Sequence, residues 1–481
     1  MKRSVDLTQG PILGQLVKLA LPIIGTSLMQ MAYNLTDMIW LGQVGSDAVA
    51  SVGAAGFYVW LGMSLLLVTR VGAEVGVSQA LGRKENETAA RFARHSLFWA
   101  IVLSVIIATI VLLLTPQLIG TFRLSKDIVE SGAISYLRIV SLGFIFSFTN
   151  PTFQGIYNGM GNSKLPFYYL LVGLGLNMLL DPILIFGVGF IPALGVNGAA
   201  WATFTSQLVV FLIFIIRFVW MKEIMDPDFK RFRLSKEISI KIFKLGTPVA
   251  TESGLFAVFA LILARMITKW GDIPIAVQSV GAQIEAISWM TSSGFATALG
   301  SFTGQNYGAK NWSRIRQGYF TTLGIGIFLG SIVTVCFIVF GEAIFSVFLN
   351  EPEALGMGII YLKILAVSQI FMIIEIVTRG AFNGIGRTIP PSVTGIIFTG
   401  ARVPAAMILS AESVLGMFGI WWAISLSSVV KGTILSIWYI FTIRKHDKPD
   451  SIETKSKLLT FIPSRIRQNI WVRNNQNNAK K

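Results

Sequence analysis

The segment Asn158-Gly-Met-Gly-Asn-Ser-Lys-Leu-Pro166 returns 225 residues later as Asn383-Gly-Ile-Gly-Arg-Thr-Ile-Pro-Pro391. Other segments repeat at nearly the same spacing, and Ala48-Val-Ala-Ser-Val-Gly-Ala54 matches Ala276-Val-Gln-Ser-Val-Gly-Ala282. Gln79 and Gly82 likewise fall on Gln305 and Gly308. Because the matches follow the same order in both stretches, the chain is interpreted as a duplication of one structural unit.

The composition is that of a membrane protein. The 481 residues are 53% hydrophobic and only 13% charged, far more apolar than a soluble domain. Apolar runs of about 20 residues or more, the length needed to cross a bilayer, recur through most of the chain. We therefore predict an all-α polytopic membrane protein with twelve transmembrane helices. The expected spans are 14–40, 48–78, 92–115, 128–153, 165–190, 195–221, 241–268, 275–303, 315–349, 356–380, 389–410 and 415–443.

The net charge of +16 is distributed unevenly along the chain. Lys and Arg concentrate at the amino terminus, in alternate loops and in the tail that begins at Arg444. This alternation is the positive-inside pattern of proteins in the inner (cytoplasmic) membrane, and it predicts that both termini are cytoplasmic. The basic charge therefore indicates topology and contact with the bilayer, and we expect no nucleic-acid partner.

The duplication divides the predicted spans into two parallel six-helix repeats. We expect a first lobe over residues 1–221, a cytoplasmic linker over 222–240, a second lobe over 241–443 and a basic cytoplasmic tail over 444–481. Because each repeat has an even number of spans, an axis along the membrane normal should relate them. Two like halves around a central cavity are typical of transporters that work by alternating access.

The first span carries a candidate site at Asp37. Gln30, Tyr33 and Asn34 precede this residue by seven, four and three positions, which places all four side chains on one helix face. A charged side chain inside a membrane costs about 2.5 kcal/mol or more on insertion scales, so each one is a candidate functional residue.

A second aspartate, Asp181, lies in the fifth span. Asn177 precedes it by one turn on the same face, and Pro182 removes a backbone hydrogen bond beside it. Tyr136 of the fourth span and Thr203 of the sixth add hydroxyl groups. Two aspartates with amide and hydroxyl partners are interpreted as a proton or sodium site. The alternative is that Asp37 and Asp181 only cap irregular turns of their helices or bond to a neighbouring helix.

The second repeat differs at the corresponding positions. Arg265 and Arg402 lie near the places where the first repeat has acids, while Glu252, Glu285 and Glu375 lie elsewhere. We predict that Arg265 and Arg402 pair with Glu252 or Glu285 and keep this half neutral. Glu375 is expected to pair with Arg379, four residues on. These residues are candidates for a substrate cavity or a secondary cation site.

The chain resembles the multidrug and toxic compound extrusion (MATE) family of prokaryotic transporters over nearly all of residues 10–445. The resemblance is carried by Pro22 with Asp37, by Asn158-Gly-Met-Gly161, by Asn177 with Asp181-Pro182, and by Asn383-Gly-Ile-Gly386. Matching blocks of the second repeat include Gly246-Thr-Pro248 with Glu252, Ala282-Gln-Ile-Glu285 and Gly304-Gln-Asn-Tyr-Gly-Ala309.

This resemblance implies a V-shaped arrangement of two six-helix lobes that exports bulky, often cationic compounds in exchange for protons or sodium. It also implies that Asp37, Asn177 and Asp181 couple the cation, with Tyr136 nearby. One departure concerns Glu252, which lies one turn after Pro248. In sodium-coupled members of one branch this glutamate lies about two turns after the proline, so the resemblance favours the site in the first repeat.

Two other classes of function remain for comparison. A flippase for lipid-linked saccharides needs basic residues for pyrophosphate, whereas here the two arginines are accompanied by glutamates. An enzyme is not expected, because the sequence shows no zinc spacing and no phosphate loop. We expect a monomeric antiporter without a cofactor, whose coupling ion is H⁺ or Na⁺, with sodium bound, if at all, by Asp37, Asp181 and Asn177.

Overall fold

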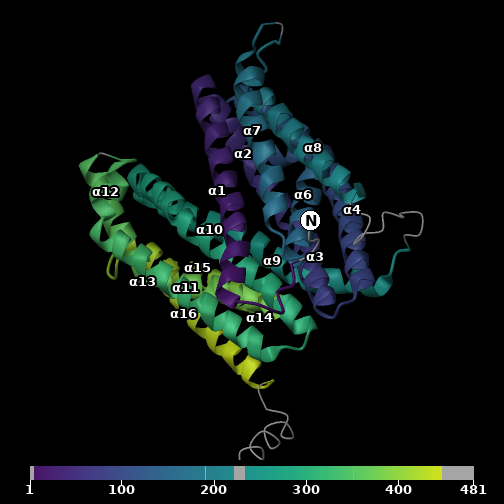
Figure 1. Ribbon diagram of the computed structural model, residues 1–481. Helices are drawn as coiled ribbons and strands as arrows, with labels where there is room; N and C mark the ends of the chain where they lie inside the picture. Colours follow the sequence, from purple (N-terminus) through teal and green to yellow (C-terminus); the bar gives the residue numbers. More distant parts are fainter. Residues whose placement is uncertain (1–4, 190, 221–232, 350, 447–481) are drawn as a thin grey trace, which may run out of the picture. The chain divides into compact units, whose positions relative to one another are not determined.

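The computed structural model describes residues 5–189, 191–220, 233–349 and 351–446 (Figure 1). The predicted tail from residue 447 onward and residues 222–232 of the predicted linker lie outside this described part. Within it the chain is helical, no β-strand is formed, and a single isolated bridge joins Val188 and Ile191. The predicted all-α fold is confirmed.

The helices of the first repeat correspond to the first six predicted spans. Their bounds are α1 (Ile12–Val44), α2 (Ser46–Ser64), α3 (Leu66–Gly82), α4 (Asn86–Gly120), α5 (Asp127–Leu142), α6 (Phe144–Gly159), α7 (Lys164–Phe186) and α8 (Val196–Trp220).

The second repeat begins with a helix that extends into the predicted linker. Its elements are α9 (Lys236–Ile267), the 3₁₀ turn η2 (Thr268–Trp270), α10 (Asp272–Gly308), α11 (Trp312–Val339), α12 (Gly341–Ser346), α13 (Pro352–Gly384), α14 (Ile389–Gly400), α15 (Arg402–Leu409) and α16 (Phe418–Arg444). Ser235 caps α9 by accepting a hydrogen bond from the backbone N–H of Ile238.

Among the described residues, ten helices are long and apolar enough to cross a membrane, or eleven if the bent pair α5 and α6 forms one span. The remaining predicted span, 275–303, coincides with α10, which has 37 residues. This helix contacts α1, α3, α11 and α13 (Figure 1). Many of its polar side chains, including Ser288, Ser301 and Gln305, are buried against these helices, whereas Ser279 and Gln283 are exposed. These polar residues lower its hydropathy.

The two repeats break their helices at different places. The fourth span bends by 49° at Gly143, between α5 and α6, whereas its counterpart α13 continues unbroken for 33 residues. The 225-residue register places Ser368 of α13 on Gly143. Glycine stabilises a helix poorly and is a common site of sharp bends, so Gly143 permits a bend that Ser368 does not favour.

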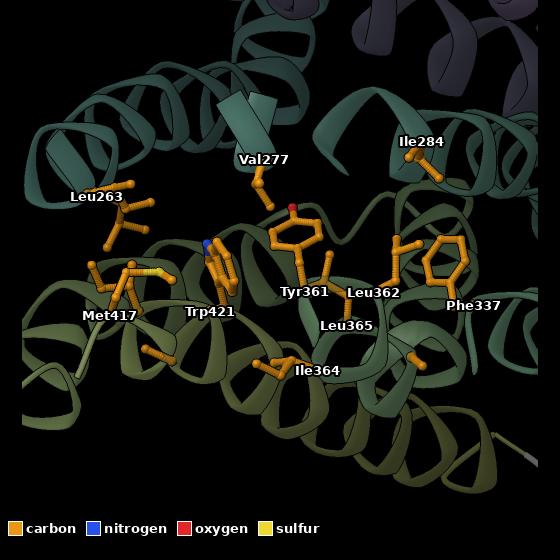
Figure 2. Packing of buried hydrophobic residues seen from close by; sticks show 14 of the residues in the cluster. Leu263, Val277, Ile284, Phe337, Tyr361, Leu362, Ile364, Leu365, Met417 and Trp421 are labelled. Atoms are coloured by element: carbon orange, nitrogen blue, oxygen red, sulfur yellow. The ribbon is translucent and has the colours of Figure 1, made fainter. Parts of the chain in front are cut away.

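The core of the second repeat is organised around two aromatic side chains. Tyr361 of α13 and Trp421 of α16 meet edge to face, with ring centroids 4.8 Å apart (Figure 2). A Cβ at Gly281 of α10 would overlap the Tyr361 ring, so glycine permits this close packing. The buried Trp421 Nε1 donates a hydrogen bond to Gln278 Oε1 at 3.0 Å, which satisfies the one polar group of the indole.

Candidate functional site

The two aspartates of the first repeat come together. Asp37 of α1 and Asp181 of α7 lie within hydrogen-bonding range of one another, and the side chain of Asp181 is completely buried. Asn177, one turn before Asp181, donates a hydrogen bond from Nδ2 to Asp181 Oδ1 at 3.2 Å. The spacing of four residues on α7 therefore produces the predicted contact.

Three oxygens of this cluster lack a hydrogen-bond donor among the described residues. They are Asp37 Oδ1, Asp181 Oδ2 and Asn177 Oδ1, and all three are buried. A buried acceptor without a partner is costly, and two facing carboxylates also repel each other. A proton or a small cation between the two carboxylates would give these oxygens a partner and would remove the repulsion.

Two tyrosines surround the aspartates. The hydroxyl of Tyr33 donates a hydrogen bond to Thr203 Oγ1 of α8 at 2.7 Å. Tyr33 and Tyr136 of α5 lie within electrostatic range of both Asp37 and Asp181. Four helices, α1, α5, α7 and α8, thus bring together most of the residues that were singled out in the first repeat, namely Tyr33, Asp37, Tyr136, Asn177, Asp181 and Thr203.

An apolar layer lies one turn beyond the aspartates. Leu41 follows Asp37 by four residues and Ile185 follows Asp181 by four, and both are buried in one cluster. Trp40 and Phe186 meet edge to face nearby, with ring centroids 6.1 Å apart. On the predicted topology this layer lies toward the outer surface, so it shields the carboxyls on that side.

Gln30 and Asn34 have exposed side chains, unlike the aspartates. Gln30 lines a small pocket between α1, α7 and α8, with a cavity volume of about 30 Å³, which is room for a water molecule or two. Sequence reasoning missed two further polar residues that line it, Ser206 and Gln207. They follow the predicted Thr203 by three and four residues, so helical spacing was a usable signal. The remaining lining residues are Thr26, Met29, Tyr33, Leu170, Gly173, Leu174 and Val210.

The second repeat contains a network of ion pairs. Arg379 Nη2 lies 2.8 Å from Glu375 Oε1 and 2.8 Å from Glu252 Oε1. Lys431 Nζ lies 3.0 Å from Glu375 Oε2. The predicted pair between Glu375 and Arg379 is confirmed. Lys431 was missed, although a lysine in the middle of an apolar span is itself a signal for a buried role.

The predicted partner of Arg265 is wrong, whereas Arg402 lies within electrostatic range of Glu285, one of its two predicted partners, without forming an ion pair in the described part of the chain. Arg402 donates hydrogen bonds to Ser427 and Ser428 of α16, and Arg265 is exposed without an ion pair among the described residues. Arg265 follows Glu252 by 13 residues of the same helix, which at about 100° per residue turns it to a different face.

Glu285 accepts a hydrogen bond from Gln369 Nε2 at 3.2 Å and lies within electrostatic range of Arg402. Three glutamates therefore meet three bases in this region. They are Glu252, Glu285 and Glu375 with Arg379, Arg402 and Lys431. Their formal charges cancel, so the expected neutrality of this half holds with different partners.

The two repeats also meet at the ends of α3 and α10. Gln79 Nε2 donates to the carbonyl oxygen of Gly384 at 2.9 Å, and Gln305 Nε2 donates to that of Gly159 at 3.1 Å. Gln305 Oε1 also accepts the backbone N–H of Leu7, at 2.9 Å. Both halves contribute to this junction, which lies on the side predicted to be cytoplasmic.

Comparison with known proteins identifies a family that matches this chain. A family model described as MatE matches residues 22–183 and 248–408, one segment in each repeat. The chain is similar to the "Probable multidrug resistance protein NorM" of Thermotoga maritima, with 28% identity over 89% of this chain and 92% of that protein. It is also similar to the "Multidrug export protein MepA" of Staphylococcus haemolyticus, with 22% identity over 93% of this chain and 98% of that protein.

Solved structures agree with the sequence relatives. The outward-facing conformation of a multidrug resistance MATE family transporter of the MOP superfamily is similar, with a TM-score of 0.86 and 27% identity. The alignment covers 93% of this chain and 99% of that one. A MATE crystal structure in complex with MaD3S has the same TM-score and identity, over 93% of this chain and 100% of the other.

Proposed function

Because the chain belongs to the MatE family, we propose that it is a cation-coupled antiporter that exports bulky, often cationic organic compounds by alternating access. The relatives are multidrug transporters in membranes and not enzymes. They do not favour the flippase alternative.

The observation that carries the proposal is the facing pair of Asp37 and Asp181 with its unpartnered oxygens. In a water-poor environment two adjacent carboxylates cannot both stay ionised unless a cation lies between them. Carboxylate and amide oxygens are the ligands that hard cations prefer. H⁺ and Na⁺ both fit this set, and loading either one removes negative charge from the helix faces of α1 and α7.

Loss of that charge is the proposed trigger for movement. Pro182 follows Asp181 directly and cannot donate a backbone hydrogen bond, so α7 resists bending least at this point. A bend there changes the distance between α1 and α7. The pocket that Gln30 and Tyr33 line lies between these two helices and α8. Cation loading would thereby alter the same surface that meets the exported compound.

The pocket is lined by the kinds of group that a flat amphipathic compound needs, but its volume is only about 30 Å³, so in this proposal it must widen before such a compound can enter. Met29, Leu170 and Leu174 provide apolar walls, while Gln30 and Gln207 provide hydrogen-bonding groups. Tyr33 offers a ring face to a cationic substrate. A cation in the aspartate site and a cationic substrate in the adjacent pocket would repel each other, which gives exchange a physical basis.

The second repeat contributes a different function in this proposal. Its buried glutamates already have basic partners in Arg379 and Lys431, so they do not need an added cation. We propose that the cation binds in the first repeat and that the second repeat has a structural role. The proposed transporter is a monomer of the cytoplasmic membrane with both termini inside.

Alternating access requires the packed cytoplasmic ends to separate. The junction of Gln79 with Gly384 and of Gln305 with Gly159 supports an assignment of this structure to a state that is closed on the cytoplasmic side. Opening toward the cytoplasm would break both contacts. No covalent change is needed, since each hydrogen bond can be replaced by water.

Efflux of ethidium from cells that lack their own pumps tests the proposal. Wild-type efflux should follow an imposed proton or sodium gradient, and the effective gradient identifies the ion. Asp37→Asn should abolish the gradient dependence. Asp127→Asn is the matched control, because Asp127 is an exposed residue in the first turn of α5. Gradient-dependent efflux that survives in Asp37→Asn would refute the proposed coupling site.

A further inference from the structure

A groove lies between α4 of the first repeat and α9 of the second, away from the aspartate site. Its apolar walls are Trp99, Leu234, Ile240 and Phe243, and Lys236 and Lys244 stand beside them. The space is about 480 Å³ and open to the outside, which is the size of a small-molecule site. The α9 residues follow one another at offsets of three, four, seven and eight, so they form one helix face.

The wall of the groove is held in place by its own contacts. Trp99 Nε1 donates a hydrogen bond to Ser239 Oγ at 3.0 Å. The rings of Trp99 and Phe243 meet edge to face, with centroids 5.0 Å apart. Both rings are therefore fixed, and they leave an apolar face toward the groove. Aromatic side chains of this kind gather at the level of lipid headgroups in membrane proteins.

The two lysines of the groove lack acidic partners. Lys236 and Lys244 are exposed, and no ion pair joins either of them to a carboxylate within the described ranges. Lys241 on the same helix differs, because its Nζ lies 2.6 Å from Glu237 Oε1. Two cations without a carboxylate partner among the described residues thus lie next to an apolar cavity, at the end of α9 that we predict to be cytoplasmic.

We propose that this groove binds an anionic phospholipid of the inner leaflet. The acyl chain would lie against Trp99, Ile240 and Phe243, and the phosphate would lie between Lys236 and Lys244. An exported organic cation is excluded by the same two charges. The basic tail is disfavoured for the same reason, since residues 447–481 contain eight Lys and Arg and three Asp and Glu.

Native mass spectrometry of the detergent-solubilised full chain tests this site. Phosphatidylglycerol should bind more tightly than phosphatidylethanolamine of the same acyl chains. The double variant that combines Lys236→Gln and Lys244→Gln should bind phosphatidylglycerol about tenfold or more weakly. The reason is that each basic residue near an anionic headgroup contributes appreciably to the binding free energy. Phe243→Ala should weaken the binding of both lipids, because it removes a contact with the acyl chain.

Lys241→Gln is the matched control for Lys236→Gln and for Lys244→Gln made singly, since each removes one positive charge from the same helix and only Lys241 lies outside the groove lining. Equal weakening by Lys241→Gln would show a general effect of inner-face charge and overturn the site. Competition by inorganic phosphate would reveal an anion site without a lipid, and equal binding of the two lipids would remove the charge argument. Lipid binding that appears only after residues 447–481 are deleted would show that the tail fills the groove.

Discussion

Gln79 and Gln305 occupy equivalent positions in the two repeats and make equivalent hydrogen bonds into the opposite repeat. Gln79 donates to the carbonyl oxygen of Gly384, and Gln305 donates to that of Gly159. Each glutamine therefore contacts the Asn-Gly pair that occurs in both repeats, in the copy that belongs to the opposite repeat. The 225-residue duplication thus creates a reciprocal contact, and we call these two bonds the glutamine junction. It closes the side of the molecule that we predict to face the cytoplasm.

Removing either glutamine should loosen this junction. A neutral hydrogen bond contributes about 1 kcal/mol, which is roughly a fivefold change in an opening equilibrium. Gln305→Ala should have the larger effect, because Gln305 also accepts the N–H of Leu7. The measurement is thiol labelling of a cysteine introduced at the buried Ser78, in a background where Cys336 is replaced by serine.

Labelling should become faster in Gln79→Ala and faster still in Gln305→Ala. Gln317→Ala is the control, because Gln317 is an exposed glutamine of α11. Identical labelling rates in all four proteins, wild type included, would show that the glutamine junction does not control access.

Two glycines allow α3 and α10 to approach at the junction. A Cβ at Gly82 would overlap the carbonyl oxygen of Gln305, and a Cβ at Gly308 would overlap that of Gln79. Alanine at either position should separate the helices and lower the free energy of unfolding by about 1–3 kcal/mol. Thermal unfolding in detergent measures this change. Gly324→Ala, where a Cβ meets nothing within 4 Å, should leave the unfolding temperature close to that of the wild type.

The ion-pair network of the second repeat should be sensitive to removal of one partner. Lys431→Met leaves one carboxylate oxygen of Glu375 without its cation, and breaking a buried pair in this way costs about 3–5 kcal/mol. Adding Glu375→Gln should recover much of the loss, because Arg379 keeps Glu252 as its partner. Thermal unfolding is again the measurement.

The matched control for this network is Lys126→Met. Lys126 pairs with Asp47 at 2.7 Å, but both side chains are largely solvent-exposed, and such pairs contribute about 1 kcal/mol or less. A Lys431→Met protein as stable as Lys126→Met would show that the buried network does not stabilise the fold.

Much of the fold could be predicted from the sequence, because the duplication and the apolar spans can both be recognised from the order of residue types. The breaks in the helices are harder, since they depend on packing between helices. The fourth span bends at Gly143, yet Gly155 lies inside a continuous helix. Glycine permits a bend without requiring one. The packing of α10 against four other helices likewise becomes clear only when its neighbours are known.

The candidate site was predictable where its contacts are local. Asn177 and Asp181 lie one turn apart, so their hydrogen bond follows from helical spacing. The partners in the second repeat were not predictable in this way. Glu252 meets Arg379 across two helices, and the register that links the repeats carries no information about such a contact. Long side chains such as Arg379 and Lys431 reach several helices, which multiplies the possible pairs.

Asp37 and Asp181 should behave as one unit in transport. If they share a single cation, Asp37→Asn, Asp181→Asn and the double variant should each lose coupled efflux to a similar degree. Residues that act independently would instead show additive losses. Initial rates of ethidium efflux from cells, normalised to the amount of protein in the membrane, distinguish these outcomes, with Asp127→Asn as the control.

Cation movement driven by substrate in proteoliposomes tests the coupling site most directly. The purified protein is reconstituted, a gradient of an organic cation is imposed, and uptake or release of H⁺ and Na⁺ is recorded without any other energy source. We predict that one of the two ions moves against the substrate in the wild-type protein and that Asp37→Asn shows no such movement. Full counter-movement of the ion in Asp37→Asn would contradict the proposed site.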